Sequence, residues 1–405
     1  MLRRVVLSLL LALAFLPAWA QGPALEAIRA PYRPFAELLA QSPAETPTAG
    51  NTVEIIRNGE EKLSLLVPDM MAAGSYIHME YFEFFKDLGS LLVRMSLKLK
   101  GLDSLEVRYL EEDFMNFPQS HAFYNNMRKT GVEVGHYSFF WLNRRNHQKI
   151  VTIDDAVAYV GGMNIGNHYF HEWDDTHLRL TGPCVKNVDA IYGEMWARTG
   201  GKPSRGVTDP GKVIPVEVPQ TAFRDVIVQE SADEPESRHI TLEAVIWLLD
   251  HCQDYLYIQT PYFTPPRELR EAMKRAVARG LDLRLLIPEK TDMSVVDPAN
   301  RSYYRECVEA GIRIFESHGR FDHTKSFVAD DYISSVGSAN LDGRSLKLNY
   351  ENCTYFYDAP VADDFKRHFL ALQEAATEVT LEQIDAWTPG RKLGNSLARI
   401  LAPQL

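Results

Sequence analysis

Apolar residues recur along this chain at two spacings, one typical of β-strands and one typical of α-helices. Short runs rich in Tyr, Ile, Val and Leu are bounded by turn residues, and the segments between them place apolar residues every three to four positions. In the first half, the predicted order is strand, helix, strand, helix, strand at 76–85, 88–100, 105–110, 120–129 and 132–136. The second half repeats this order at 255–260, 266–279, 281–287, 298–310 and 312–315. Such alternation predicts an α/β fold with a largely parallel or mixed sheet between helices in each half.

The first twenty residues differ from the rest of the chain. Two arginines precede a nearly unbroken apolar run at 5–16, and Ala18-Trp-Ala20 follows it. This order is typical of a secretory signal peptide, and the run is shorter than the roughly 18 apolar residues that span a membrane. We therefore expect export to the periplasm or the cell exterior, with an uncleaved N-terminal anchor as the alternative.

The composition and the periodicity of the chain predict the boundaries between its domains. Residues 21–50 hold one weak helix and a Pro/Thr/Ala-rich connector, which predicts an N-terminal extension outside the core. Residues 201–220 are rich in Gly and Pro and break both periodicities, which predicts a linker. Two lobes remain, at 51–200 and 221–405, and a chain of 405 residues is long enough for two such cores.

The net charge limits the possible binding partners, and the spacing of the cysteines indicates their redox state. The formal net charge is −11, and loss of the first twenty residues would remove two arginines and no acid. A chain this acidic lacks the overall positive charge typical of nucleic-acid-binding proteins, so no nucleic-acid partner is expected. The four cysteines show no CxxC spacing, which favours buried free thiols, with one disulfide in the second half as the alternative. They are Cys184, Cys252, Cys307 and Cys353.

Two stretches of the chain carry the same set of polar residues, beginning at His147 and at His323. Counted from each His, a lysine falls at +2, an aspartate at +7, a glycine at +14, an asparagine at +17 and an acid at +28. The pairs are Lys149 and Lys325, Asp154 and Asp330, Gly161 and Gly337, Asn164 and Asn340, and Asp175 and Glu351. Matching offsets at six positions are hard to obtain by chance, so we interpret the two stretches as an internal duplication with one shared function.

These residue types suit the chemistry of a phosphodiester. Imidazole has an unperturbed pKa of about 6.5, so one His can attack phosphorus while a second, protonated, supplies the leaving oxygen with a proton. The two lysines and two asparagines would hold the non-bridging oxygens, and Asp175 and Glu351 would each orient an imidazole. One His cannot be nucleophile and acid at once. The two motifs are therefore expected to meet across a pseudo-two-fold interface between the lobes.

The paired HxKxxxxD motifs, each followed by a Gly-x-x-Asn turn, resemble those of the phospholipase D superfamily. From about residue 53 to 405, the flanking phrases are similar to those of bacterial cardiolipin synthases. These phrases include Arg145-Asn-His147-Gln-Lys149, Tyr159-Val-Gly161-Gly-Met-Asn164, Trp173-Asp-Asp175-Thr-His177, Thr260-Pro-Tyr-Phe263, Gly337-Ser-Ala-Asn340-Leu-Asp342 and Leu348-Asn-Tyr-Glu351. The resemblance implies two α/β/α sandwich lobes with the active site at their interface. It also implies metal-independent phosphatidyl transfer through a phosphohistidine, without a cofactor.

The resemblance further implies individual roles. His147 would be the nucleophile and His323 the acid and base, while Asp154 and Asp330 would be structural supports. The expected reaction is cardiolipin synthesis from phosphatidylglycerol at a membrane surface. Three positions depart from the family pattern, with Gln148 and Asp174 where arginine is common and Gly343 where an aromatic is common. The signal peptide also replaces the usual two membrane-spanning helices. The acceptor thus stays open, and a hydrolytic phospholipase D, a secreted nuclease of the superfamily and an inactive lipid-binding module are the alternatives.

Weaker patterns complete the sequence picture. Glu80 and Gln259 occupy matching places in the first strand of each half and are candidates for lining the substrate pocket, with ordinary sheet positions as the alternative. A group of His and Asp residues between 168 and 177 resembles metal ligands, but its spacing fits no single helical face, so no metal is expected. The aromatic runs at 139–141 and 169–170 either border an acyl-chain groove or pack in the core. The oligomeric state is left open by the sequence.

Overall fold

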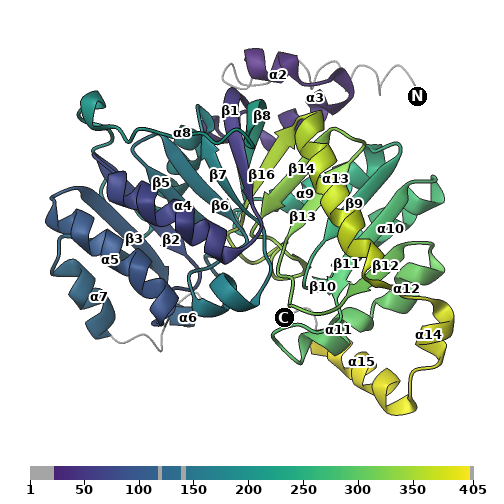
Figure 1. Ribbon diagram of the computed structural model, residues 1–405. Helices are drawn as coiled ribbons and strands as arrows, with labels where there is room; N and C mark the ends of the chain where they lie inside the picture. Colours follow the sequence, from purple (N-terminus) through teal and green to yellow (C-terminus); the bar gives the residue numbers. More distant parts are fainter. Residues whose placement is uncertain (1–21, 117–120, 138–142, 402–405) are drawn as a thin grey trace.

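The computed structural model describes residues 22–116, 121–137 and 143–401 (Figure 1). The predicted signal peptide and the aromatic run at 139–141 lie outside these residues. Within them, no helix combines the length and the apolar character needed to cross a membrane.

Across the described residues, fifteen strands hydrogen-bond into one continuous sheet that runs through both lobes. In chain order these are β1 (Thr48–Ile56), β2 (Tyr76–Tyr81), β3 (Glu106–Glu112), β4 (Glu133–Tyr137), β5 (Lys149–Ile153), β6 (Val157–Gly161), β7 (His177–Thr181), β8 (Phe223–Ala232), β9 (Tyr255–Gln259), β11 (Asp282–Pro288), β12 (Arg313–Ser317), β13 (Ser326–Ala329), β14 (Ile333–Gly337), β16 (Asn352–Tyr357) and β17 (Thr377–Glu378). The short strands β10 (Phe263–Thr264) and β15 (Leu341–Asp342) form a separate parallel pair.

The strand order repeats, as the duplicated motif predicts. The first lobe runs β4-β3-β2-β5-β6-β7-β1, and the second runs β12-β11-β9-β13-β14-β16-β8. In each lobe the first three strands of this order are parallel, and the rest pair antiparallel. The two orders meet where β1 pairs antiparallel with β8, so the lobes share one sheet edge to edge. The expected mixed α/β architecture is confirmed.

Helices cover both faces of this sheet (Figure 1). The longer ones are α4 (Gly59–Ala72), α5 (Leu88–Leu102), α7 (His121–Arg128), α8 (Cys184–Arg198), α9 (Ile240–His251), α10 (Arg267–Ala278), α13 (Ala359–Glu374) and α15 (Pro389–Leu401). The single helix expected at 298–310 is two short helices, α11 (Val296–Arg301) and α12 (Tyr304–Glu309). The strand expected at 76–85 ends at Tyr81, and the residues after it form a loop that reaches the candidate site.

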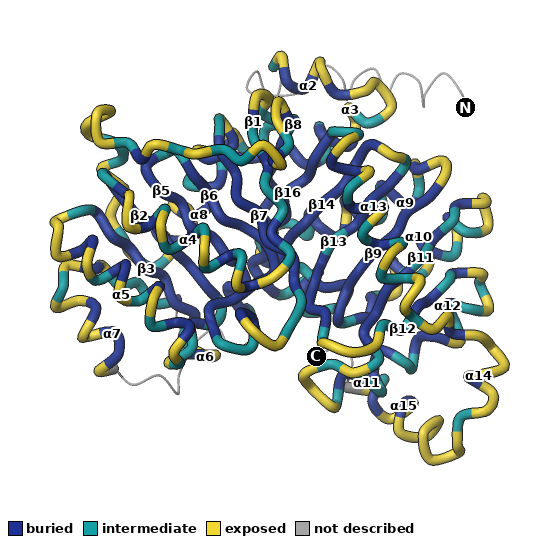
Figure 2. Tube along the Cα trace, viewed as in Figure 1, coloured by how far each residue is buried: buried dark blue, intermediate teal, exposed yellow. Residues whose placement is uncertain are grey.

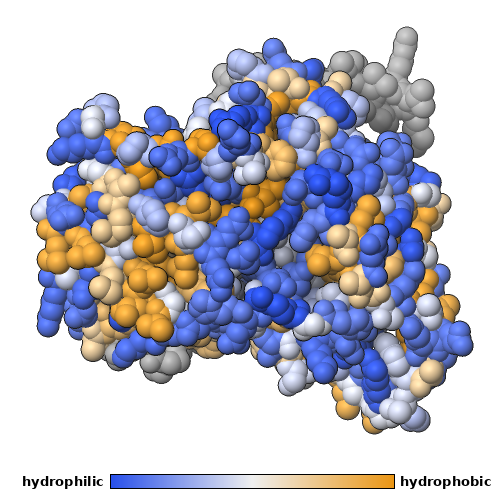
Figure 3. All heavy atoms as spheres, viewed as in Figure 1, coloured by the Kyte–Doolittle hydropathy of each residue, from blue (hydrophilic) through white to orange (hydrophobic). Residues whose placement is uncertain are grey.

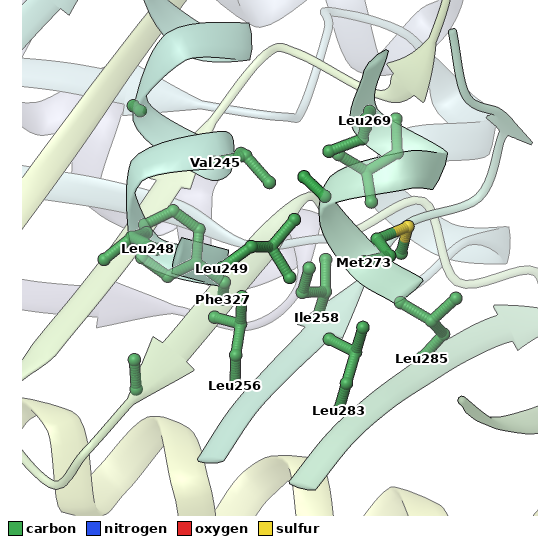
Figure 4. Close-up of a cluster of buried hydrophobic side chains, with 14 of the residues drawn as sticks. Val245, Leu248, Leu249, Leu256, Ile258, Leu269, Met273, Leu283, Leu285 and Phe327 are labelled. Atoms are coloured by element: carbon green, nitrogen blue, oxygen red, sulfur yellow. The ribbon is translucent and has the colours of Figure 1, made fainter. Parts of the chain in front are cut away.

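Both faces of the sheet are buried, and the strands are dark blue along most of their length in Figure 2. Figure 4 shows how the second lobe fills the layer between the sheet and helices α9 and α10 with apolar side chains. The residues there include Val245, Leu248, Leu249, Leu256, Ile258, Leu269, Met273, Leu283, Leu285 and Phe327. All four cysteines are buried free thiols, as the lack of a CxxC spacing predicts.

The N-terminal segment differs from the expectation of an extension outside the core. Helices α2 (Pro23–Ala27) and α3 (Arg33–Leu39) place Leu25, Ile28 and Phe35 in the same buried cluster as α9 and the second-lobe strands. The Phe35 ring lies 5.1 Å from the ring of Trp247. The segment therefore packs on the second lobe, although it precedes the first lobe in the sequence. Its few apolar residues contact α9, and the order of residues along the chain does not reveal this contact.

Asp154 and Asp330 hold equivalent tight turns at the far end of the motif strands. Both adopt the left-handed region, with φ of 56° and 49°, which aspartate tolerates better than most residues. The Asp154 carboxylate is fully buried and accepts backbone N–H groups of Gly74, Ser75 and Tyr76 at 2.7–2.8 Å, and of Ile214 at 3.1 Å. Asp330 receives backbone N–H groups from residues 253–255 in the same way. These contacts are those of a structural support.

We expect Asp154→Asn to lower the free energy of unfolding by about 3 kcal/mol or more, because the amide loses the charge and one of the two acceptor oxygens that four N–H groups share. Urea unfolding followed by circular dichroism measures this loss. Asp103→Asn, at an exposed position after α5, is the matched control and should change stability by less than about 0.5 kcal/mol. Equal stabilities of the two variants would contradict the structural role.

Candidate active site

The two motif histidines are held by main-chain hydrogen bonds that cross between the lobes. The backbone N–H of His147 donates to the carbonyl oxygen of Tyr350 at 2.9 Å, and that of His323 donates to the carbonyl oxygen of Asp174 at 2.7 Å. Parallel bridges pair Asn146 with Tyr350 and Asp174 with Asp322 at the same places. The residues that enter each motif strand are thus fixed by the opposite lobe.

The side-chain pairs cross between lobes as well. Nδ1 of His147 lies 2.7 Å from Oε2 of Glu351, and Nδ1 of His323 lies 2.8 Å from Oδ2 of Asp175. Each imidazole is therefore oriented by the acid of the other lobe, and in both the Nε2 atom is left as the reactive nitrogen. The matching spacing in the sequence indicates these two acids, but it does not indicate which His each of them serves.

The two acids have different surroundings at the equivalent positions that follow β6 and β14. Gly162 leaves room for Asp175, since a Cβ atom there would lie 2.2 Å from Oδ1 of the carboxylate. In the second lobe the corresponding residue is Ser338, whose hydroxyl donates to Oε2 of Glu351 at 2.5 Å. Asn349 donates to the other oxygen of Glu351 at 3.0 Å. Glu351 thus receives more hydrogen bonds than Asp175.

This difference separates the two acids electrostatically. Burial alone would raise the pKa of Glu351, but His147, Lys149 and the Ser338 hydroxyl outweigh it and lower the pKa to about 2. Burial raises the pKa of Asp175 to about 7, against the opposing charge of Lys325. Glu351 is therefore fully deprotonated at neutral pH, whereas Asp175 titrates near neutral pH.

Both imidazoles have lowered pKa values and are uncharged at neutral pH. Burial lowers the pKa of His147 to about 4, with Glu351 opposing this effect and Lys149 adding to it. Burial and the charges of Lys325 and Lys149 hold the pKa of His323 well below its usual range. A proton on His147 would lower the pKa of His323 further, so the two rings belong to one electrostatic cluster.

The motif lysines lie fully inside this cluster. Nζ of Lys149 donates to the carbonyl oxygen of His147 at 2.6 Å, and Nζ of Lys325 donates likewise to that of His323. Burial lowers the pKa of Lys149 to about 7 and that of Lys325 to about 8, and each ammonium lowers the pKa of His147 as well. Two closely placed cations and two neutral imidazoles form a site suited to an anionic phosphodiester.

The predicted asparagines differ in their surroundings. The side-chain NH2 of Asn164 donates to the hydroxyl of Tyr169 at 2.7 Å and to Oε2 of Glu83 at 3.1 Å. The Oδ1 atom of Asn340 is buried without a hydrogen-bond partner. Because the two ends of an amide exchange by rotation, Asn340 can present its NH2 group to a phosphate oxygen. Asn340 is thus the readier of the two to receive a ligand.

Glu80 and Gln259 lie beneath the two motifs, and Gln259 lines a small cavity together with Lys325. Both are buried, and each contacts the residue that precedes a motif histidine. Asn146 donates to Oε2 of Glu80 at 3.1 Å, and Gln259 donates to Asp322. Burial raises the pKa of Glu80 to about 8. These two side chains therefore support the strands that present His147 and His323.

The sequence pattern marks Tyr169 as a possible border of a substrate groove, but it does not indicate Glu83 or the rest of the aromatic wall of the site. Glu83 lies in the loop after β2, where burial raises the pKa of its carboxyl to about 7 and Lys149 opposes this effect. The ring of Phe82 lies 4.6 Å from that of His147, and several aromatic rings surround His323 at 5.5–6.4 Å. These are Tyr169, Trp173, Tyr262 and Phe321. The apolar run at 76–85 predicts one continuous strand, so it gives no sign that Phe82 and Glu83 lie in a loop at the site.

The His and Asp residues at 168–177 do not gather as metal ligands. Asp175 is bound to His323, the His168 ring packs on Phe85 at 4.7 Å, and both ring nitrogens of His177 are buried without a hydrogen-bond partner. Over the residues that the structure describes, three possible ligand atoms converge only at Glu111, Asp113 and His136. Tyr169 and Phe170 are buried, and Tyr169 also lies beside His323.

Comparisons with known proteins agree with this geometry. A family model described as "Cardiolipin synthase, PLD-like domain" matches residues 245–373. A cardiolipin synthase of Oceanobacillus iheyensis is 31% identical over 372 residues, which cover 88% of this chain and 76% of that protein. A cardiolipin synthase of Geobacillus kaustophilus is also 31% identical, over 87% of this chain and 72% of its own length. The solved phosphatidylserine synthase of Haemophilus influenzae has a similar fold, with a TM-score of 0.63 at 15% identity, covering 87% of this chain and 95% of that one.

The duplicated strand order, the paired His-Lys motifs and the matching family model define a member of the phospholipase D superfamily. Within that superfamily, the chain belongs to the cardiolipin synthase family. The resemblance found in the sequence is confirmed, and the protein is a phospholipase D-family enzyme.

Proposed function

We propose that this protein is a phosphatidyltransferase that makes cardiolipin from two molecules of phosphatidylglycerol. The observation that carries the proposal is the crossed arrangement of His147 with Glu351 and His323 with Asp175 around two buried lysines. It supplies a nucleophile, a proton carrier and fixed positive charge in one place.

In the first step, Nε2 of His147 attacks the phosphorus of one phosphatidylglycerol. The bond from phosphorus to the headgroup oxygen breaks, and His323 gives that oxygen a proton, so glycerol leaves. In the second step, a glycerol hydroxyl of another phosphatidylglycerol gives its proton to His323 and attacks the same phosphorus. The phosphorus–nitrogen bond breaks, which releases cardiolipin and restores neutral His147.

The assignment of the two histidines rests on their acids. Glu351, with its low pKa, keeps a negative charge behind His147 and stabilises the positive charge that the ring gains on phosphorylation. The pair of His323 and Asp175 is closer to sharing a proton at neutral pH, because the pKa of Asp175 is raised to about 7. A phosphodiester bound at Lys149 and Lys325 cancels part of the charge that disfavours protonated His323. These features support His147 as nucleophile and His323 as acid and base.

We expect kcat/KM to fall as the pH rises through about 7 to 8. The lowered pKa values of Lys149 and Lys325 mean that the cations are present below this range and are lost above it. On the acid side, neutral His147 persists down to about pH 4, since its pKa is lowered. A pH profile with dispersed short-chain phosphatidylglycerol measures both limbs. A decline only above pH 10, where an ordinary lysine titrates, would contradict the lysine role.

The reaction itself is tested by lipid mass spectrometry after incubation of the purified protein with phosphatidylglycerol in EDTA. We expect cardiolipin and glycerol in equal amounts, with no effect of the chelator. Phosphatidic acid as the product would instead indicate water as the acceptor, and degradation of plasmid DNA would indicate a nuclease. A rate no higher than that of His147→Ala would indicate a lipid-binding module.

We further propose that the enzyme acts outside the cytoplasm at a membrane surface. The basic start, the apolar run at 5–16 and the Ala18-Trp-Ala20 sequence support this location. The N-terminus of protein isolated from cells is expected at Gln21, as determined by mass spectrometry. An intact N-terminus on protein recovered from the soluble cytoplasmic fraction would contradict export.

A further inference from the structure

One helix of the first lobe presents a row of large apolar side chains to solvent. Along α5, five such residues recur every three or four positions, so they share one face of the helix. They are Leu88, Leu92, Met95, Leu99 and Leu102, with exposed fractions of 76%, 52%, 47%, 44% and 63%. Orange spheres gather over this part of the first lobe at the lower left of Figure 3. We call these five residues the α5 stripe.

The α5 stripe is not the face by which the helix packs. Val93 and Leu97, on the other side of α5, are fully buried in the core of the first lobe. Single exposed leucines are common on protein surfaces, whereas a contiguous apolar row marks a surface that contacts something else. The core of the first lobe thus packs against the opposite face of α5, and the α5 stripe takes no part in that packing.

The charges of α5 indicate the chemistry of the partner. The segment from 88 to 102 contains no acidic residue, although the whole chain carries a formal net charge of −11. Its charged residues are Arg94, Lys98 and Lys100, and Arg94 and Lys98 are half-buried beside the α5 stripe. A helix with an apolar face flanked by basic side chains is suited to the surface of an anionic bilayer.

The same charges disfavour a second copy of the chain as the partner. The spacing of the α5 stripe would suit the seam of a two-helix coiled coil, in which flanking acids and bases usually pair across the interface. Two α5 helices would instead bring their cations together, and the helix has no acid to compensate them. A bilayer that contains phosphatidylglycerol supplies the missing negative charge.

The start of the α5 stripe is tied to a segment of the candidate active site. It begins at Leu88, six residues after Phe82, whose ring lies 4.6 Å from that of His147. Asn167 lies next to the aromatic wall. Its side-chain Oδ1 accepts a hydrogen bond from the backbone N–H of Gly89 at 2.7 Å, and its own backbone N–H donates to Oδ2 of Asp87 at 2.7 Å. The first turn of α5 is thereby fixed to the segment that surrounds His323.

We propose that the α5 stripe is the surface on which an anionic phospholipid bilayer docks, so that lipid phosphates reach the two histidines while the acyl chains stay in the bilayer. This inference rests on the proposed function for its substrate. It adds to that function the part of the molecule that meets the membrane.

An environment-sensitive dye on Met95→Cys tests the contact directly in the full-length protein. The four native thiols are buried, so the introduced cysteine can be labelled selectively. Vesicles of equal parts phosphatidylglycerol and phosphatidylcholine are expected to shift the emission to the blue, and a lipid-attached quencher to reduce it. The same dye on Glu271→Cys, at an exposed position of α10, is the control and should not respond. No response at position 95, or a shift without vesicles that grows with protein concentration, would overturn the proposal.

A double variant, Leu92→Ser with Leu99→Ser, tests the consequence for turnover. Both side chains are about half exposed, so the fold should tolerate the change. We expect turnover on vesicles to fall at least about ten-fold, because two apolar side chains no longer enter the bilayer. Turnover of dispersed short-chain phosphatidylglycerol should not change. Leu381→Ser, at an exposed apolar position of α14 (Leu381–Asp385), is the control and should leave turnover on vesicles unchanged.

Wild-type turnover of the Leu92 and Leu99 variant on vesicles would overturn the docking role. Failure of the proposed reaction would appear differently, as the absence of cardiolipin from wild-type protein on both forms of substrate. The dye on position 95 reports binding without turnover, so its result is independent of the reaction.

Discussion

Replacing either His147 or His323 with alanine is expected to lower turnover of phosphatidylglycerol by roughly 10⁴-fold or more, since each step of the proposed reaction needs both rings. His147→Ala removes the atom that attacks phosphorus, and no neighbouring side chain can replace it. His323→Ala removes the proton carrier. Cardiolipin formation measured by mass spectrometry gives the rates, and circular dichroism shows whether the fold survives.

The two variants are expected to differ when the leaving group needs no proton. A nitrophenyl phosphodiester loses nitrophenolate without a proton donor as His147 attacks the phosphorus, so His323→Ala should still release nitrophenolate in a burst and accumulate phosphorylated His147. His147→Ala should show neither. His171→Ala, at an exposed histidine of the same loop region, is the matched control and should retain wild-type rates. Phosphorylation of His147→Ala at His323 would reverse the assigned roles.

Much of the fold follows from the duplication in the sequence. Two copies of one motif at fixed offsets predict that the strands around them repeat, and the strand order of the two lobes does so. Helices such as α5 and α10 were predicted nearly to their ends, since their apolar spacing is regular and Gly280 lies just past the end of α10. Local periodicity determines these features, and local periodicity is visible in the sequence.

Features that depend on contacts between distant segments could not be predicted in this way. The helices α2 and α3 pack on the second lobe because they contact the surface of α9, which forms only in the folded protein. The loop after β2 continues the apolar run of its strand, so the sequence gives no signal at Tyr81 where the strand ends. Equal offsets place Asp175 and Glu351 in the site without revealing that each acid crosses to the other lobe.

The crossed acids lead to the second prediction, for Glu351→Gln and Asp175→Asn. Each amide keeps the shape of the side chain and can still accept a hydrogen bond from Nδ1, but it no longer stabilises positive charge on the imidazole. We expect kcat to fall by about 10² to 10⁴-fold in each variant, as for other buried acids that orient a catalytic histidine. Glu236→Gln, at a partly exposed acid paired with Arg144, is the matched control and should retain activity.

The same two variants distinguish crossed from uncrossed pairing through the leaving group. With the nitrophenol substrate, Asp175→Asn should recover its burst, because Asp175 serves the proton carrier His323. Glu351→Gln should stay slow with either substrate, because Glu351 serves the nucleophile His147. If each acid instead served the histidine of its own lobe, the recovery would appear in Glu351→Gln. Rapid-mixing measurement of the nitrophenol burst in both variants therefore tests the interface between the lobes as well as the chemistry.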